Sequence, residues 1–114
     1  MTRTRLVHPT DFQILDALGD GRRDTAANLA ASIGKDRNYL NTRLPVLADE
    51  GLIRRIGPAE SSGLYQITPR GVAAGQNETL YKTDREQFEI ALAEQAPRIT
   101  ITEPTIHQSS TPTK

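Results

Sequence analysis

The chain has 114 residues, enough for one domain with a single core and too few for two. Its 14 Lys and Arg residues balance 14 Asp and Glu residues, so net charge alone does not predict a nucleic-acid partner. Cysteine is absent, which excludes a disulfide framework, a thiolate nucleophile and a cysteine-ligated metal site. The opening MTRTRLVHP lacks the apolar run of a signal peptide, and no stretch approaches the about 18 apolar residues of a membrane span, so we expect a cytoplasmic protein.

The first two helices are predicted from capping residues and apolar spacing. We expect residues 1–9 to form a flexible arm, and residues 11–18 to form a helix that begins with a Thr10–Gln13 capping box. Its buried stripe consists of Phe12, Leu15 and Leu18, with Ile14 at the edge. A second helix follows from the spacing of Ala26, Leu29, Ala30 and Ile33. Asp24 or Thr25 caps it, and Gly34 provides the turn after it.

A third helix is predicted from Asp36 to just before Gly51. Its core side carries three leucines at i, i+4 and i+7: Leu40, Leu44 and Leu47. At 100° per residue, the opposite side carries Asn38, Asn41, Thr42 and Pro45, with Arg37 on its flank. Pro45 removes one backbone hydrogen bond, at a cost of about 3 kcal/mol in an ordinary helix. We interpret it as a tolerated kink; alternatively, the bend shapes a groove contact.

Two short β-prone runs follow, over residues 52–56 and 64–68, and Gly57, Pro58 and Gly63 mark the loop between them. Thr68 and Pro69 then begin another helix, with Thr as the cap and Pro at the first helical position. The order of helix, turn, helix and two-stranded ribbon predicts a winged helix-turn-helix domain over residues 10–80. The fold class is therefore mainly α with a small two-stranded β-wing.

The C-terminal part predicts a helix outside the compact domain. Residues 84–95 follow a Thr83–Glu86 capping box and carry a narrow apolar stripe. Because such a stripe usually finds a partner, we expect residues 81–96 to form a homodimer interface through Tyr81, Phe88, Ala91 and Leu92. The alternative is that Phe88 folds back onto its own subunit. The Thr- and Pro-rich residues 97–114 predict a disordered tail, although Ile99 and Ile101 could alternate in an edge strand.

The outward side of the third helix fits DNA recognition. Asn, Arg and Thr side chains can bond base edges in the major groove, so the predicted base contacts are Arg37, Asn38, Asn41 and Thr42. The alternative is an ordinary solvated helix face. Predicted phosphate contacts are Lys35, Arg43, Arg54, Arg55, Ser61 and Ser62. Of the two wing arginines, strand alternation lets only one point away from the core. Residues 35–55 hold five basic and three acidic side chains, a weak positive bias in a neutral chain.

These segments also resemble a known family. The runs NYLNTRLPVLADEGL (38–52), IGPA (56–59) and SGLYQIT (62–68) are similar to winged-helix haloarchaeal proteins related to the repressor of halophilic phage phi-H. The proline inside the third helix is part of this resemblance, which covers roughly Thr10 to Gly71 and more weakly the segment from Tyr81 to Gln95. The resemblance implies a transcriptional regulator that reads DNA with the third helix. The neutral charge departs from the acidic composition usual in halophilic cytoplasmic proteins.

We therefore predict a sequence-specific DNA-binding transcriptional regulator, a homodimeric repressor that needs no cofactor or metal. The alternative is a winged-helix protein–protein module that does not touch DNA, which the neutral charge would allow. A nonspecific chromatin protein would need a basic surface that this chain lacks. Catalysis is not expected, because His8 and His107 have no second histidine or carboxylate at ligand spacing and Asp49 and Glu50 point in different directions.

Overall fold

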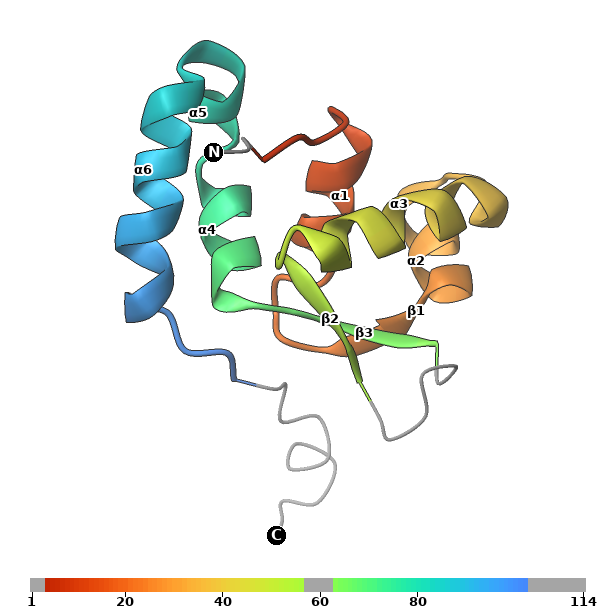
Figure 1. Ribbon diagram of the computed structural model, residues 1–114. Helices are drawn as coiled ribbons and strands as arrows, with labels where there is room; N and C mark the ends of the chain where they lie inside the picture. The colour runs from red at the N-terminus through yellow and green to blue at the C-terminus, as the bar shows by residue number, and fades with distance from the viewer. Residues whose placement is uncertain (1–3, 57–62, 103–114) are drawn as a thin grey trace, which may run out of the picture.

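The computed structural model describes residues 4–56 and 63–102, and it confirms a mainly helical fold with a small antiparallel sheet (Figure 1). The helices are α1 (Thr10–Ala17), α2 (Ala26–Ile33), α3 (Arg37–Asp49), α4 (Pro69–Gln76), α5 (Glu78–Thr83), α6 (Arg85–Gln95) and the 3₁₀ turn η1 (Ala96–Arg98). The strands are β1 (Arg23–Thr25), β2 (Ile53–Ile56) and β3 (Leu64–Ile67). This order of α1, α2, α3 and the β2–β3 ribbon is a winged helix-turn-helix, as the sequence predicts.

Local capping builds the helix-turn-helix. The Thr25 hydroxyl accepts a hydrogen bond from the Asn28 backbone N–H (3.2 Å), which starts α2. Gly34 ends α2 in the left-handed conformation (φ 72°), a conformation that glycine adopts without a steric cost. The Asp36 carboxylate then accepts from the Asn38 N–H (2.7 Å) and starts α3. The Thr25 cap and the Gly34 turn are therefore as predicted, and α3 begins one residue later than expected because Asp36 is its cap.

The sheet has a third strand that the sequence does not predict. Its order is β1-β3-β2, and all pairs are antiparallel. β1 is only three residues long and has no alternating apolar pattern, so its pairing with β3 arises from tertiary contacts and not from propensity. In the register, Gln66 of β3 lies between Arg23 of β1 and Arg54 of β2. β2 is consequently an edge strand with one side open.

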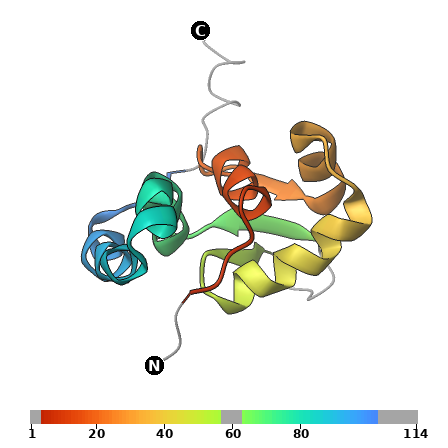
Figure 2. The same ribbon diagram turned by 90° about the horizontal axis from the view of Figure 1, so that it is seen from above.

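The core joins the winged domain to the C-terminal helices. The three predicted leucines of α3 are fully buried. Ile14 is also fully buried, and not at an edge as predicted, because α1 packs against α2 on one side and α4 on the other. Figures 1 and 2 show α4, α5 and α6 gathered at one side of the molecule, with α3 and the ribbon at the other.

Helix α6 is part of this core, which contradicts the exposed stripe expected from the sequence. Phe88 and Leu92 have no exposed surface within the single chain, and Ala91 is also buried. The Phe88 ring meets the Tyr81 ring edge-on, with 5.1 Å between the ring centres. The centre of the Tyr81 ring lies 5.3 Å from that of Phe12 of α1. Residues predicted as a dimer interface therefore pack inside their own chain, and the homodimer stays a prediction without an exposed stripe to support it.

Two predicted capping boxes are wrong. At α1 the cap position is Pro9, and no side chain bonds the first turn from there; Thr10 is already helical and buried. At α6 the cap is Asp84, whose carboxylate accepts from the Gln87 N–H (3.2 Å). The Thr83 hydroxyl instead donates to the Thr79 carbonyl inside α5. Because the chain forms two helices here, the start of α6 lies one residue beyond the expected position.

The described part of the N-terminal segment is held in place and is not a flexible arm. Thr4 is 1% exposed, and its N–H and hydroxyl donate to the two carboxylate oxygens of Glu89 on α6 (2.9 and 3.1 Å). The Tyr81 hydroxyl accepts from the Leu6 N–H (2.7 Å) and donates to the Leu6 carbonyl (2.8 Å). Arg85 donates to the Thr4 carbonyl. Residues 1–3 lie outside the described part of the chain.

The first residues of the predicted tail also contact the core. Pro97 and Arg98 belong to η1, and Ile99 and Ile101 pack half-buried against the core cluster. These two isoleucines form no strand, because no neighbouring strand pairs with them within the described residues. The rest of the predicted tail, residues 103–114, lies outside the described residues.

A buried ion pair fixes α3 against α1. The Arg43 guanidinium donates to both carboxylate oxygens of Asp11 (Nε to Oδ1 3.0 Å, Nη2 to Oδ2 2.7 Å). Asp11 has no exposed side-chain surface, whereas 16% of the Arg43 side chain is exposed. Asp11 Oδ2 also accepts from the Val7 N–H (2.7 Å), so one carboxylate joins the N-terminal segment, α1 and α3. The hydrogen bond with Asp11 raises the pKa of Arg43, which stays charged at every working pH.

Two glycines of α4 give a matched pair for testing the packing. A Cβ at Gly71 would fall on the Leu52 carbonyl oxygen and 2.7 Å from Ile67 Cγ1, whereas a Cβ at Gly75 would meet only Leu15 Cβ, at 3.8 Å. We expect Gly71→Ala to destabilise the protein by about 1–3 kcal/mol or more. Gly75→Ala should stabilise it by up to about 1 kcal/mol, because alanine favours a helix. Urea unfolding measures both; equal effects of the two substitutions would contradict the close approach of α4 to Leu52.

The Asp11–Arg43 pair can be tested by a double-mutant cycle. We expect Asp11→Ala to cost about 3 kcal/mol, since it leaves a mostly buried guanidinium unpaired. The double variant Asp11→Ala, Arg43→Met should cost less than the sum of the single changes. Asp20→Ala is the control, because it removes the exposed Asp20–Arg22 pair, which should contribute little. Additive single effects in urea unfolding would show that the two side chains are not coupled.

Candidate functional site

The exposed side of α3 carries the polar side chains that the sequence predicts as base contacts. All four predicted base contacts are exposed on this one helix: Arg37, Asn38, Asn41 and Thr42. Their placement follows from burial of the leucine stripe on the opposite side. Helix α3 runs as one helix through Pro45, which is half-buried, so the proline does not end the exposed face.

The hydrogen-bonding capacity of this face differs from residue to residue. Within the described chain, the side chains of Arg37 and Asn41 have no hydrogen-bond or ion-pair partner. Both therefore keep all of their donors, and Asn41 keeps its acceptor oxygen. The Thr42 hydroxyl donates its single proton to the Tyr39 carbonyl (2.6 Å), so it is available only as an acceptor. Asn38 bonds Asp36 only through its backbone N–H, so Arg37, Asn38 and Asn41 are the residues best able to bond a base edge.

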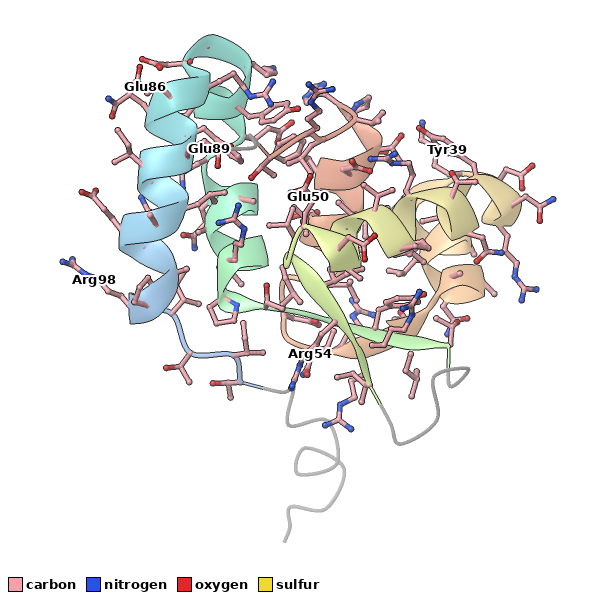
Figure 3. All side chains as sticks on the ribbon, viewed as in Figure 1. Tyr39, Glu50, Arg54, Glu86, Glu89 and Arg98 are labelled. Atoms are coloured by element: carbon pink, nitrogen blue, oxygen red, sulfur yellow. The ribbon has the colours of Figure 1, made fainter. Side chains whose placement is uncertain are left out.

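Tyr39 is an exposed aromatic residue of α3 that the sequence reasoning missed. Its side chain is 37% exposed, and it lies near the start of α3 (Figure 3). A tyrosine there joins an apolar ring with a hydroxyl that can bond a phosphate or a base. An aromatic residue on a polar helix face was the available signal, in a chain where Phe, Tyr and Trp make up only 4% of the residues.

Two of the predicted phosphate contacts on this helix and its turn are constrained. Arg43 is held by Asp11, as described above, so its guanidinium is turned toward α1 and away from the exposed face. Periodicity placed Arg43 correctly on the helix but could not show that a carboxylate from α1 would take it. Lys35 lies half-buried in the turn between α2 and α3, where its backbone N–H donates to the Ala30 carbonyl (3.0 Å).

The wing arginines lie on opposite faces of the sheet, and both are exposed. Arg55 shares its face with Tyr65, and its guanidinium carbon lies 5.9 Å from the centre of that ring. Arg54 shares the other face with Gln66 and donates to its amide oxygen (3.0 Å; Figure 3 labels Arg54). The prediction that only one arginine points away from the core is wrong, because β2 is an edge strand and long side chains reach solvent from both faces.

Gln66 holds the ribbon to the rest of the domain. It is only 2% exposed, and its amide nitrogen donates to the Gly21 carbonyl (2.8 Å) while its oxygen accepts from Arg54. Both polar atoms of this buried amide therefore have a partner, as burial of an amide requires. The wing tip, with the predicted contacts Ser61 and Ser62 and the turn residues Gly57 and Pro58, lies outside the described residues.

Charge is unevenly distributed between the two sides of the molecule. Residues 35–55, which span α3 and most of β2, carry five basic and three acidic side chains, although Arg43 is neutralised by Asp11. Residues 78–95, which form α5 and α6, carry five acidic and two basic side chains. Glu86 and Glu89 lie on α6, on the far side of the molecule from Tyr39 (Figure 3). The neutral total therefore combines a mildly basic segment with an acidic one.

Other chemistry has little support in the described part of the chain. His8 Nε2 lies 2.6 Å from Glu78 Oε2, a contact that sequence spacing did not reveal. Among residues 4–56 and 63–102, no three His, Asp or Glu side chains come together as ligands for a metal ion. In the same residues, no helix is long and apolar enough to cross a membrane.

Comparison with known proteins adds a likeness in fold. No protein-family model matches the chain, and no curated protein matches it. One solved structure, which describes how the Zα domain of Cyprinid Herpesvirus3 ORF112 binds Z-DNA, is similar with a TM-score of 0.48 and 21% sequence identity. The alignment covers 55% of this chain and 98% of the Zα chain. At this similarity it carries no argument about function, and the winged-helix assignment rests on the elements and strand pairing described above.

Proposed function

We propose that this protein binds double-stranded DNA and acts as a sequence-specific transcriptional regulator. The observation that carries the proposal is the two-sided α3: its leucine side is fully buried, and its other side presents Arg37, Asn38 and Asn41 to solvent. Helix α3 is the second helix of the helix-turn-helix, the position that enters the major groove in proteins of this architecture.

The side chains of α3 suit base readout. An Arg guanidinium can donate twice to guanine O6 and N7, and an Asn amide can bond adenine N6 and N7 in both directions. Arg37 and Asn41 are free to do so, because neither side chain has a partner in the described chain. Thr42 can accept from an amino group of cytosine or adenine, while Tyr39 adds contact area at the start of the helix.

Phosphate contacts come from the wing in this proposal. Arg54 and Arg55 are exposed on the edge strand β2, which follows α3 directly in the chain. Such contacts fix the orientation of the reading helix without reading sequence. The acidic segment in α5 and α6 would lie away from the DNA, where it does not oppose the phosphates. We infer that a repressor would act by occupying its site, because binding alone blocks other proteins.

Retention on DNA at two salt concentrations tests the proposal. We expect the full chain to be retained on genomic duplex DNA and released as salt rises, because phosphate binding releases counterions. Sequencing DNA crosslinked to the protein in cells would then give the preferred site. A chain that is not retained at low salt, or that enriches no sequence, would favour the protein–protein module instead.

The first functional prediction concerns the reading helix. We expect Asn41→Ala to weaken binding to the preferred site by about 1–3 kcal/mol, the contribution of one bidentate base contact, with little effect on unrelated DNA. Gln87→Ala is the matched control, since it removes an exposed amide from α6. Fluorescence anisotropy with both DNAs measures the change. An equal loss on both DNAs would make Asn41 a positioning residue, and no loss would remove α3 as the reader.

The second functional prediction concerns the wing. Each of Arg54→Gln and Arg55→Gln should weaken binding to all sequences alike and lower the slope of log K against log salt by about 0.9. Arg98→Gln is the control, because it removes an exposed arginine from η1. Thermal melting must accompany Arg54→Gln, which leaves the Gln66 oxygen without its partner. A salt slope that stays unchanged in both wing variants would contradict wing contact.

A further inference from the structure

A pocket of about 380 Å³ lies between α1 and α4, apart from the exposed face of α3. Its apolar lining consists of Pro9, Phe12, Leu15, Ile67 and Val72. This volume falls in the range of sites that hold small organic molecules, which are usually apolar with a few polar groups that fix orientation. The proposed DNA contacts use none of these residues.

The polar groups of this pocket are all hydrogen-bond acceptors or neutral amides. Two carboxylates, Asp16 and Glu78, line it, and none of its lining residues is Lys, Arg or His. Glu78 Oε2 contacts His8, so the other oxygen of that carboxylate remains available. The Asp16 carboxylate has no hydrogen-bond or ion-pair partner in the described chain. Asp16 therefore brings to the pocket a negative charge that no side chain of the described residues bonds, whereas Glu78 is paired with His8.

One acceptor in the lining is buried and unsatisfied. The Gln13 side-chain oxygen has essentially no exposed surface and no hydrogen-bond partner. Buried polar atoms are nearly always bonded, so an exception calls for a specific explanation. Gln13 and Asp16 stand three residues apart on α1, and side chains at that spacing share one face of a helix. This oxygen is closed to a water-sized molecule, so a donor that enters the pocket would bond Asp16 and reach the Gln13 oxygen only if the Gln13 side chain rotates.

Gly75 keeps this pocket open. It lies inside α4, where glycine disfavours the helix, yet its φ is not positive and an added Cβ would meet no atom closer than 3.8 Å. Neither backbone conformation nor close packing therefore requires a glycine here. Gly71, one turn earlier, differs because it lies against the Leu52 carbonyl. The missing side chain at Gly75 leaves space beside Leu15 that a ligand can occupy.

We propose that this pocket binds a small organic cation, a primary ammonium group attached to an apolar body. An ammonium group has three N–H donors, which can bond the Asp16 carboxylate, the second oxygen of Glu78 and, once the Gln13 side chain rotates, the Gln13 oxygen. The apolar body would lie against Phe12 and Leu15. Charge selects the class of ligand, because an anion would meet two carboxylates and a neutral alcohol would lose the charge-assisted hydrogen bonds.

Three probes with one carbon skeleton test the proposal: 2-phenylethylammonium, 2-phenylethanol and phenylacetate. Titration of the ¹⁵N-labelled full chain follows the Gln13 side-chain amide and the backbone amides of Gly71 and Gly75. We expect saturable, millimolar binding of the ammonium probe, binding of the alcohol about tenfold weaker, and no localised shift with phenylacetate. Equal binding of alcohol and ammonium, or no saturation by the ammonium probe, would overturn the proposal. This readout uses free protein and does not depend on DNA binding.

Variants then locate the site. Gly75→Leu should fill the pocket and abolish the shifts, and Asp16→Asn should weaken the ammonium probe without affecting the alcohol. Gln13 and Asp16 also border a second hollow beside α2, which Ser32 lines and the glycines do not. Ser32→Leu is therefore the matched control and should leave binding intact. Loss of binding in Ser32→Leu but not in Gly75→Leu would overturn the assignment to this pocket. If Gly75→Leu does not fold, Asp16→Asn still tests whether the carboxylate selects the ammonium probe, and loss of binding in Ser32→Leu would still move the site to the second hollow.

Discussion

The position of α3 depends on a carboxylate that sits in the interior of the protein. Asp11 has no exposed side-chain surface, and it is stabilised by two bonds from Arg43 and one from the Val7 N–H. A buried carboxylate without these donors would be strongly unfavourable, so the three segments that supply and receive them must stay together. The leucine stripe sets which side of α3 faces inward, but apolar packing is not directional. The paired hydrogen bonds add direction and hold the helix at one rotation relative to α1.

The same constraint explains why the N-terminal segment and α6 belong to the winged domain. Val7 is bonded to Asp11, while Thr4 and Leu6 are bonded to Glu89 and Tyr81 of the C-terminal helices. The segment therefore connects α3, through Asp11, to the opposite side of the molecule. Phe88 fills the space beside Tyr81, and the narrow apolar stripe of α6 covers one side of α4.

The sequence predicts well those features that are local. Thr25, Gly34 and Asp36 determine the helix-turn-helix through bonds and backbone conformations within a few residues, and the cap at Thr25 and the turn at Gly34 are as predicted. The roles of Phe88 and Arg43 were misjudged because the tertiary fold supplies their partners. Phe88 packs against Tyr81, which in turn contacts Phe12, and Arg43 bonds Asp11. Spacing along the sequence shows none of these contacts. Periodicity gave the correct side of α3, with Arg37 as a base contact, yet it left Arg43 available as a phosphate contact. Only the tertiary structure shows that the Arg43 guanidinium is bonded to Asp11 of α1, while Arg37 has no partner in the described residues.

This distinction decides which substitutions can report on function. Replacing Arg43 would remove a positive charge from α3, but it would also leave Asp11 buried without its main partner, so a loss of DNA affinity could reflect a shifted helix. Asn41 has no side-chain partner in the described chain, and its truncation disturbs no contact within the protein. A loss of binding there would report on the partner molecule itself. For the same reason Asp16 is a cleaner probe of the α1–α4 pocket than Gln13, because Asp16 is exposed and its carboxylate bonds nothing else in the described residues.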